Sequence, residues 1–291
     1  MNNILLQMAL FTKPIIKWVG GKSQILTKVI DKFPKDIDVY HDIFVGGGSV
    51  LLGLIEYKNR GIIKVNKIYA YDYNKYLIDL YNCIKKDPNK LYNEIIKLVE
   101  IYNNCLEFKG NKKPKSIEEA IKSKESYYYW NRTEFNKELD DIYYKSALFV
   151  FINKTCFRGM YRTGPNGFNV PFGHYKKPSI INKEHLLKVS LLIKNVIFIH
   201  CDFKESILKI KINDFVYLDP PYYPTNPKSF VKYNKNGFNI DEHNTLFTMC
   251  DDLNKKNIKY IMSNSSAKEV INHFNKYKII YIDCKRRINS K

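Results

Sequence analysis

The sequence has no uninterrupted apolar segment long enough to cross a membrane. A spanning helix needs roughly 18 or more apolar residues, and no run in the 291-residue chain approaches that length. The apolar stretch near the N-terminus has neither a basic region before it nor a small-residue cleavage site after it, so it does not resemble a secretory signal. We therefore expect an intracellular protein without a membrane anchor.

Closely spaced cysteine pairs are also missing. No two of the six cysteines have the C-x-x-C spacing, which argues against both a zinc site and a disulfide framework. A reducing compartment is the simplest expectation for such a chain. The cysteines are Cys83, Cys105, Cys156, Cys201, Cys250 and Cys284.

Acidic residues are few relative to basic ones. The chain has 48 lysines and arginines against 29 aspartates and glutamates, which gives a formal net charge of +19. Such an excess attracts polyanions and makes association fast and salt-sensitive. Enrichment in Lys, Asn, Ile and Tyr is also typical of AT-rich coding sequence, so on charge alone a nucleic-acid partner and a mutational bias are both open.

What the sequence does have is an alternation of strand and helix patterns at both ends. Over residues 15–85, strand-like segments lead through glycine-rich or acidic turns into amphipathic helical segments. The same rhythm returns at NVIFIHCDF, DFVYLDPPYY, NIKYIMSNSS and YKIIYIDCK. This pattern predicts an α/β, Rossmann-like fold with a parallel sheet and helices on its faces.

A different pattern interrupts that rhythm. Residues 86–150 have helical periodicity and little strand signal, and the following segment, FRGMYRTGPNGFNVPFGHYKKP, is dense in Gly, Pro, Arg and Lys. Its central Asn-Gly favours a β-hairpin or an extended loop. We therefore place a mainly helical, basic insertion at residues 77–181, with a hairpin at 157–173, inside an α/β domain formed by residues 1–76 and 182–291.

Glycines and carboxylates stand where the predicted strands end. Phe44–Val50 reads FVGGGSV, and its glycines let a backbone approach a ligand closely, although a tight strand-to-helix turn is the simpler alternative. Asp72 ends the next strand, where a carboxylate can accept both hydroxyls of a ribose or cap a helix. Asp202 ends another strand and could accept a hydrogen bond from an adenine amino group or serve as a cap.

The most specific motif is Asp219-Pro220-Pro221-Tyr222, directly after the strand-like FVYL. Two prolines cannot continue a strand, so they imply a rigid, unusual backbone. The exocyclic amine of a base is a poor nucleophile because its lone pair is delocalised into the ring. A carboxylate and the Pro220 carbonyl, both accepting its N–H groups, would favour attack by this nitrogen, and Tyr222 offers a face on which an extruded base stacks.

Taken in order along the chain, these motifs resemble those of the Dam-type (D12 class, alpha group) DNA adenine-N6 methyltransferases. KWVGGKSQIL resembles the N-terminal motif of that family, FVGGGSV its methyl-donor loop and FNVPFGHYKKP the end of its target-recognition hairpin; CDF, DFVYLDPPYYP and SNSS follow in family order. The resemblance covers nearly the whole chain. It implies an S-adenosylmethionine-dependent methyltransferase fold with an inserted, mainly helical target-recognition domain, and a site-specific enzyme that acts on duplex DNA.

The resemblance also implies the cofactor and its site. S-adenosylmethionine (AdoMet) would be the methyl donor, with no metal; Asp72 would hold its ribose and Asp202 its adenine. An adenine flipped from the duplex would enter beside Asp219, and its N6 amine would attack the methyl group in line. Asp219 would orient the amine rather than act as a strong base. The other residues of the donor pocket would be Trp18, Lys22, Phe44, Gly46 and Gly48.

In the family, the segment that matches CFRGMYRTGPNGFNVP reads the recognition site. Phe157 would fill the gap that the flipped base leaves, and Arg162 would contact a guanine, as bidentate pairing in the major groove permits. Met160 and Pro171 could touch a thymine methyl group. Phosphate contacts, with an ordinary solvated surface as the alternative, would come from Lys17, Lys176 and Lys177.

Three departures from the family pattern stand out. Asp42-Ile43 replaces the common Glu-Pro before the donor loop, and Arg158 stands where relatives that methylate GATC usually carry Asn. GATC is therefore the first expectation, while CATG or another short palindromic site stays open. The chain also stops at RRINSK, before the basic turn and last strand of family members, which would leave YKIIYIDC with an exposed edge.

Two other functions remain open from the sequence alone. One is an AdoMet-dependent N-methyltransferase that acts on RNA or protein, although such relatives more often carry Asn-Pro-Pro-Tyr and lack the helical insertion. The other is a DNA-binding relative that has lost turnover. We expect double-stranded DNA as the partner, a monomer in solution, and a restriction endonuclease as a functional but not a physical partner.

Overall fold

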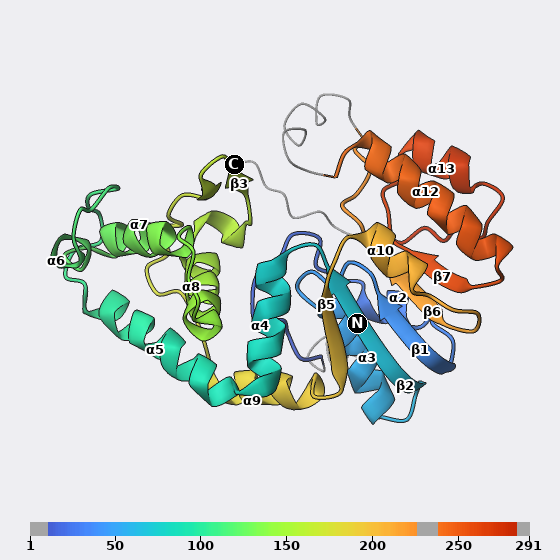
Figure 1. The fold of residues 1–291 in the computed structure, drawn as a ribbon, viewed down its shortest axis with the longest axis horizontal. Helices are drawn as coiled ribbons and strands as arrows, with labels where there is room; N and C mark the ends of the chain where they lie inside the picture. Colours follow the sequence, from blue (N-terminus) through green and yellow to red (C-terminus); the bar gives the residue numbers. More distant parts are fainter. Residues whose placement is uncertain (1–10, 226–237, 284–291) are drawn as a thin grey trace. The chain divides into compact units, whose positions relative to one another are not determined.

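The computed structural model describes residues 11–225 and 238–283, and their contacts divide the chain into two compact units (Figure 1). Unit 1 comprises the described residues of 1–13, 22–73 and 201–291, and unit 2 comprises 14–21 and 74–200. The sequence placed the corresponding boundaries at 76/77 and 181/182. The predicted α/β fold with a parallel sheet is confirmed.

A parallel sheet forms the centre of unit 1. Strand β1 (Asp36–Asp42) pairs in parallel with β2 (Lys64–Asp72) on one side and with β6 (Phe215–Leu218) on the other, and β6 pairs in parallel with β7 (Lys259–Met262). All four residues of β6 are buried, as parallel strands covered on both faces require. The C-terminal ends of these strands therefore lie along one edge of the sheet.

A buried polar network ties the middle strands together. His41 of β1 lies between Tyr71 of β2, with 3.0 Å from Nδ1 to Oη, and Asp214, with 2.9 Å from Nε2 to the carboxylate. Burial lowers the pKa of His41 despite the neighbouring carboxylate, so the ring is neutral at pH 7. Because Asp214 directly precedes β6, this network holds the three strands whose ends carry the motif residues.

Helices cover this sheet. Helices α3 and α10 both contact β2, and α12 contacts β7. Helices α12 and α13 lie side by side in Figure 1, where Phe247 and Phe274 meet edge to face with ring centroids 5.0 Å apart. The helices of unit 1 are α2 (Leu26–Ile30), α3 (Ser49–Asn59), α10 (Phe203–Leu208), α12 (Ile240–Lys255) and α13 (Lys268–Phe274).

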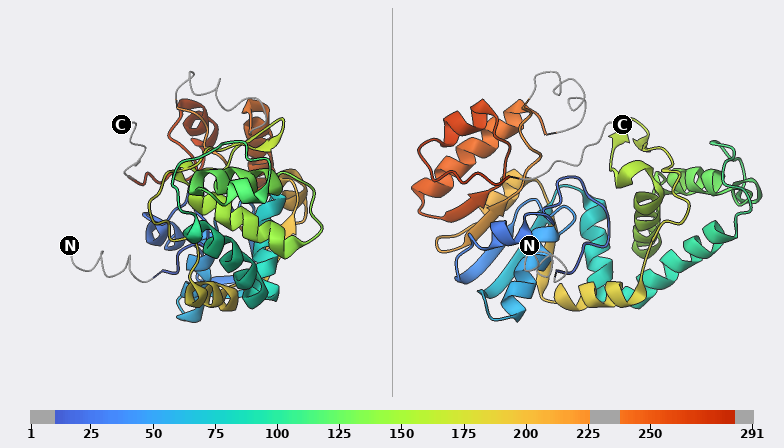
Figure 2. Two further views of the ribbon diagram at one scale, coloured as in Figure 1. Left: turned by 90° about the vertical axis from the view of Figure 1, so that its left-hand side faces the viewer. Right: turned by 180° about the vertical axis from the view of Figure 1, so that it is seen from behind.

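Unit 2 is mainly helical, and α8 is its central element (Figure 2). Helices α4, α5 and α7 all contact α8, which is apolar around most of its surface because it is buried on several sides. The elements of unit 2 are α4 (Lys75–Lys86), α5 (Pro88–Asn104), α6 (Ile117–Ala120), α7 (Lys124–Phe135), α8 (Ile142–Thr155), the 3-10 turn η1 (Phe157–Gly159), β3 (Thr163–Gly164), β4 (Gly167–Phe168), α9 (Lys183–Leu192) and β5 (Val196–His200). Within the described ranges, no helix has the length and apolarity to cross a membrane.

One predicted strand is wrong. The pattern YKIIYIDCK predicts a strand from residue 277, but residues 277–283 have no regular secondary structure, and Ile280 and Tyr281 are exposed. A strand needs a partner for its N–H and C=O groups, and no described residue pairs with this segment. Residues 284–291, which include Cys284 and the RRINSK ending, lie outside the described residues.

Candidate active site

The glycine-rich turn begins directly after β1. Gly46 and Gly48 have φ values of 48° and 77°, a left-handed backbone that glycine adopts without steric cost. Gly48 is the residue before α3, and its N–H bonds the carbonyl of Val45 at 2.8 Å. Phe44 packs against Phe203 with ring centroids 5.7 Å apart. The turn thus places a side-chain-free glycine backbone and an aromatic ring at the C-terminal edge of the sheet.

Asp72 holds this turn instead of capping a helix. Its Oδ2 accepts a hydrogen bond from the Gly46 N–H at 2.9 Å. The following helix, α4, is capped by Asn74, whose side chain accepts from Tyr76 N–H. The capping alternative for Asp72 is therefore wrong, and its carboxylate lies beside the glycine-rich turn.

Asp202 does cap a helix. Its Oδ1 accepts from the Lys204 N–H at 2.8 Å at the start of α10. A carboxylate has a second oxygen with further acceptor sites. The cap is therefore compatible with a hydrogen bond to an adenine amino group, which stays a prediction.

The Asp-Pro-Pro-Tyr segment follows β6, and its Asp219 forms a largely buried ion pair with Lys22. Lys22 Nζ lies 2.6 Å from Asp219 Oδ2 and 4.8 Å from the centroid of the Tyr222 ring. The other oxygen of Asp219, Oδ1, is buried and has no hydrogen-bond partner among the described residues. Tyr222 is 39% exposed. One carboxylate oxygen is thus engaged, while the second has unused acceptor capacity.

Burial raises the pKa of Asp219 to about 6, and the ammonium of Lys22 offsets only part of that effect. Burial alone would lower the pKa of Lys22, but Asp219 and Tyr222 raise it overall. Lys22 is therefore charged at pH 7, and Asp219 is mainly ionised there.

Two residues that the sequence did not single out hold this segment. Asn264 Oδ1 accepts from the Tyr223 N–H at 2.9 Å, and Ser265 Oγ donates to the Tyr223 carbonyl at 2.6 Å. Both belong to SNSS, directly after β7. Polar residues directly after a predicted strand could have indicated them from the sequence. Their role is to position the backbone after Tyr222.

Asp42 is a third carboxyl group at this edge. In the sequence it stood out only as a departure from the family pattern. It is 2% exposed, receives one long hydrogen bond of 3.4 Å from Tyr40 Oη, and its Oδ1 has no partner within the described part of the chain. Burial, together with Asp219 and Asp72, raises the pKa of Asp42 well above its usual range.

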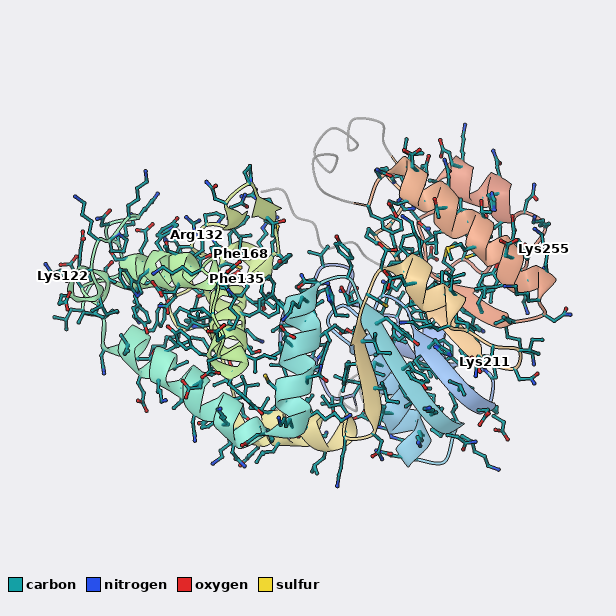
Figure 3. All side chains as sticks on the ribbon, viewed as in Figure 1. Lys122, Arg132, Phe135, Phe168, Lys211 and Lys255 are labelled. Carbon is teal, nitrogen blue, oxygen red and sulfur yellow. The ribbon has the colours of Figure 1, made fainter. Side chains whose placement is uncertain are left out.

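The predicted reading segment lies in unit 2, where it forms a shorter hairpin than residues 157–173. Strands β3 and β4 pair Thr163 with Phe168 and Gly164 with Gly167. Asn136 of unit 2 bonds Phe168 twice, by accepting from its N–H at 2.8 Å and donating to its carbonyl at 2.9 Å. Figure 3 shows Phe168 near Phe135, whose ring it meets edge to face.

The side chains predicted to read bases point outward from this framework. Phe157 is 41% exposed, and its N–H bonds the Pro171 carbonyl at 2.8 Å. Arg158 has a left-handed φ of 57° and donates its N–H to Tyr175 Oη. Arg162 Nε bonds Asn169 Oδ1 at 2.7 Å. Pro171, Lys176 and Lys177 are exposed and Met160 is half-buried.

The segment before Gly21 is also part of unit 2. Lys17 bonds Asn153 through its backbone, packs beneath Gly159 and places its Nζ 4.7 Å from the Tyr175 ring centroid. Trp18 packs on Phe149 and Tyr161. Lys17 therefore lies beside the predicted reading segment, and the place of Trp18 in a donor pocket stays a prediction.

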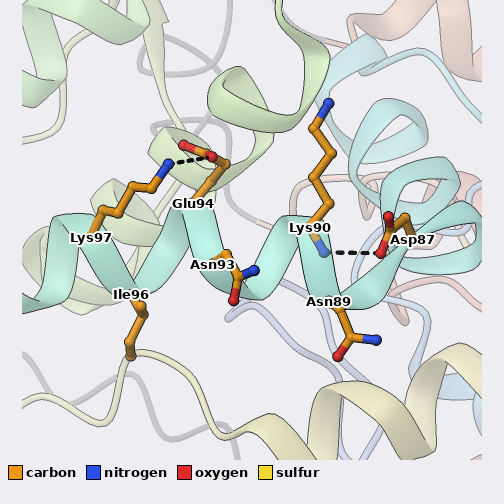
Figure 4. A pocket seen from close by; sticks show the side chains of 7 residues that line it. All are labelled: Asp87, Asn89, Lys90, Asn93, Glu94, Ile96 and Lys97. Carbon is orange, nitrogen blue, oxygen red and sulfur yellow. Dashed lines mark hydrogen bonds and ion pairs between the residues drawn. The ribbon is translucent and has the colours of Figure 1, made fainter.

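A hollow of about 640 Å³ lies elsewhere, along α5 (Figure 4). Its lining comes from Asp87–Lys97 of this one helix, and Figure 4 shows Glu94 paired with Lys97 and Asp87 bonded to the backbone of Lys90. These are ordinary surface contacts of a single helix, and none of the motif residues takes part.

The sequence match to known proteins now completes this description. A family model described as D12 class N6 adenine-specific DNA methyltransferase matches residues 18–288. The chain belongs to this family. The prediction of an adenine-specific DNA methyltransferase is therefore confirmed, and family membership implies DNA as the substrate and AdoMet as the methyl donor.

Relatives of the family cover almost the whole chain. The chain is 35% identical over 289 residues to the Type II methyltransferase M.MjaIII of Methanocaldococcus jannaschii, which covers 96% of this chain and 93% of that protein. It is 28% identical over 286 residues to a Type II methyltransferase of Lactococcus lactis subsp. cremoris, covering 95% and 90%. It is 27% identical over 280 residues to the DNA adenine methylase of Escherichia coli (strain K12), covering 96% and 90%.

Proposed function

We propose that this enzyme methylates the N6 of an adenine that is flipped out of a short palindromic duplex site, with GATC as the first candidate and CATG as the next. The observation that carries the proposal is the buried Oδ1 of Asp219, which has no hydrogen-bond partner in the described part of the chain and lies next to two prolines and the exposed ring of Tyr222. A buried acceptor without a donor is costly, and a purine amine would supply that donor.

The chain's own residues would activate the amine by orientation. Asp219 Oδ1 and the Pro220 carbonyl would each accept one N6–H, which draws the nitrogen lone pair out of the ring. Tyr222 would stack on the flipped base. AdoMet supplies an electrophilic methyl group on a positively charged sulfur.

The site fits this donor on structural grounds. The left-handed Gly46 and Gly48 leave room for a ligand against the backbone, and Asp72 already holds the turn. Asp42 has a buried oxygen with no partner among the described residues, which suits a cationic ligand. Phe44 and Asp202 would complete the contacts to the donor's adenosine.

Unit 2 would supply recognition of the site, with residues 77–181 as the target-recognition domain. The guanidinium of Arg162 donates hydrogen bonds to the side chain and to the backbone carbonyl of Asn169, which fix its direction, and it would read a guanine. Phe157 would fill the space of the flipped base. Arg158, a cation where an amide is usual in GATC-specific relatives, is the reason for testing CATG beside GATC.

The test is a methyl-transfer assay with labelled AdoMet on matched duplexes that contain GATC, CATG or a scrambled site. We expect label in one palindromic duplex and none in the scrambled duplex. Label only in RNA or in protein would overturn the proposal, as would transfer to all duplexes alike.

A variant of Asp219 tests the mechanism. Asp219→Ala should keep AdoMet and DNA binding and lower turnover by several orders of magnitude, because the amine loses its acceptor. Asp252→Ala, which removes an exposed carboxylate on α12, is the matched control and should retain full turnover. Unchanged turnover in Asp219→Ala would remove this residue from the mechanism.

A further inference from the structure

Three carboxyl groups and one ammonium group meet at the C-terminal edge of the sheet in unit 1. Asp42 ends β1, Asp72 ends β2 and Asp219 follows β6, all on neighbouring parallel strands. Lys22 is the buried cation there, and it pairs with Asp219 at 2.6 Å. Asp42 is left with a 3.4 Å contact to Tyr40 and an Oδ1 that has no partner among the described residues.

Among the described residues, no cation forms an ion pair with Asp42, and the charged neighbours that act on it most strongly are the carboxylates Asp219 and Asp72. An isolated buried charge is far more expensive than a buried neutral acid. The titratable groups that act on Asp42 are Tyr40 from its own strand, Asp72 from β2, Tyr217 from β6, Asp219 after β6, and Lys22. Burial is the largest cause of the raised pKa of Asp42, with Asp219 and Asp72 adding to it and Lys22 opposing it only weakly. Burial and the two neighbouring carboxylates therefore favour the neutral form of Asp42.

The methyl donor and the product that it becomes differ in charge at the sulfur atom. AdoMet carries a positive sulfonium, and the product S-adenosylhomocysteine carries a neutral thioether, while their amino and carboxylate groups are alike. The glycine-rich turn starts two residues after Asp42, and ligands of such sheets bind at this edge. A positive charge placed there would stabilise the ionised form of a neighbouring acid.

We propose that Asp42 is the residue that responds to the charge of the donor, giving up its proton to solvent when AdoMet binds and keeping it when S-adenosylhomocysteine binds. The inference rests on the proposed function, since it needs AdoMet at this edge. It predicts that Asp42 favours AdoMet over S-adenosylhomocysteine, because only the sulfonium gains a new carboxylate partner.

Calorimetric titration in two buffers that differ in ionisation enthalpy measures proton release directly. At pH 7, the wild-type enzyme should release close to one proton per AdoMet and close to none per S-adenosylhomocysteine. Asp219, with a pKa of about 6, has only about a tenth of a proton left to release at this pH. The donor's own α-amino group is mainly charged at pH 7, so it can take up only about a tenth of a proton on binding.

Asp42→Asn is the decisive variant, because an amide resembles the neutral acid and should leave the fold intact, as a thermal melt would check. Proton release with AdoMet should disappear, and the affinity ratio of AdoMet to S-adenosylhomocysteine should fall by about tenfold. Asp252→Asn, a change at an exposed carboxylate, should keep both values.

The outcomes separate this inference from the proposed function. Binding of AdoMet without proton release, or unchanged release in Asp42→Asn, would overturn the role of Asp42 while leaving methyl transfer intact. A wild-type enzyme that binds no AdoMet would overturn both.

Discussion

At the scale of single residues, the candidate site is governed by one buried ion pair. Asp219 keeps a pKa of about 6 although Lys22 lies 2.6 Å away, because burial outweighs the attraction of the ammonium. In the proposed mechanism, its carboxylate must be ionised to accept hydrogen bonds from both Lys22 and the substrate amine. The protonation of Asp219 should therefore limit activity on the acid side.

The pH dependence of kcat/KM for DNA at saturating AdoMet tests this, since it reports the enzyme before the base binds and does not include the proton that AdoMet binding releases. Activity should fall about tenfold per pH unit below about pH 6. In Lys22→Met, burial would act unopposed on Asp219, so the acid limb should move to higher pH by roughly one unit. Lys255→Met, at an exposed lysine, should leave the limb in place, and a limb that does not move in Lys22→Met would contradict the assignment.

At the scale of elements, the short β3–β4 hairpin is held by side chains rather than by a long ladder. Two residues per strand give little stability by themselves. Asn136 replaces the missing partner strand with two hydrogen bonds to Phe168, and Asn169 holds Arg162. The exposed residues that are predicted to read the site are therefore carried by a hairpin that these side-chain hydrogen bonds hold in place.

Asn136→Ala should loosen this hairpin, because the buried N–H and C=O of Phe168 lose their partners, at about 1–3 kcal/mol for each such group. Hydrogen exchange of the Phe168 amide should speed up, and KM for DNA should rise while AdoMet affinity stays constant. Asn111→Ala, which changes an exposed asparagine of unit 2, serves as the control. Equal exchange rates in Asn136→Ala and the wild type would show that the hairpin stands without it.

Arg162→Ala should relax discrimination at one base pair of the site by about 1–3 kcal/mol. Relative kcat/KM values on a set of duplexes with one substitution each measure this directly. Asn169→Ala should produce a smaller loss at the same position, because it frees the guanidinium without removing it. Selectivity that stays the same at every position would mean that another segment reads the site.

At the scale of the whole molecule, the net charge of +19 now has a partner in the DNA substrate of the family. DNA affinity should fall steeply with salt, with a slope in a log–log plot of about −0.9 for each phosphate contact. Lys17→Ala should reduce that slope by about 1 without a change in site preference. Fluorescence anisotropy from about 50 to 200 mM salt covers the informative range, and a salt-independent affinity would count against an electrostatic interface.

The sequence by itself determined the chemistry and most of the strands. Local backbone conformation and residue type are enough to predict three features: the glycine turn, the carboxylates at strand ends and the Asp-Pro-Pro-Tyr segment. None of them requires knowledge of the tertiary structure. The periodicity of residues 36–42, 64–72, 196–200, 215–218 and 259–262 predicts strands that the structure contains. The same pattern predicts a strand at residues 277–283, where the structure has none. Strand formation depends on a hydrogen-bonding partner and not only on composition.

Only the tertiary structure decided which partner each polar group has. It assigned Asp72 to the glycine turn and the α4 cap to Asn74, and it paired Lys22 with Asp219. It also left Asp42 Oδ1, at the end of β1, without a hydrogen-bond partner among the described residues. These interactions connect residues up to 197 positions apart in the sequence. They determine how deeply each carboxyl group is buried and which charges surround it. The pKa of a carboxyl group depends on that three-dimensional surrounding, which no local pattern of side chains contains.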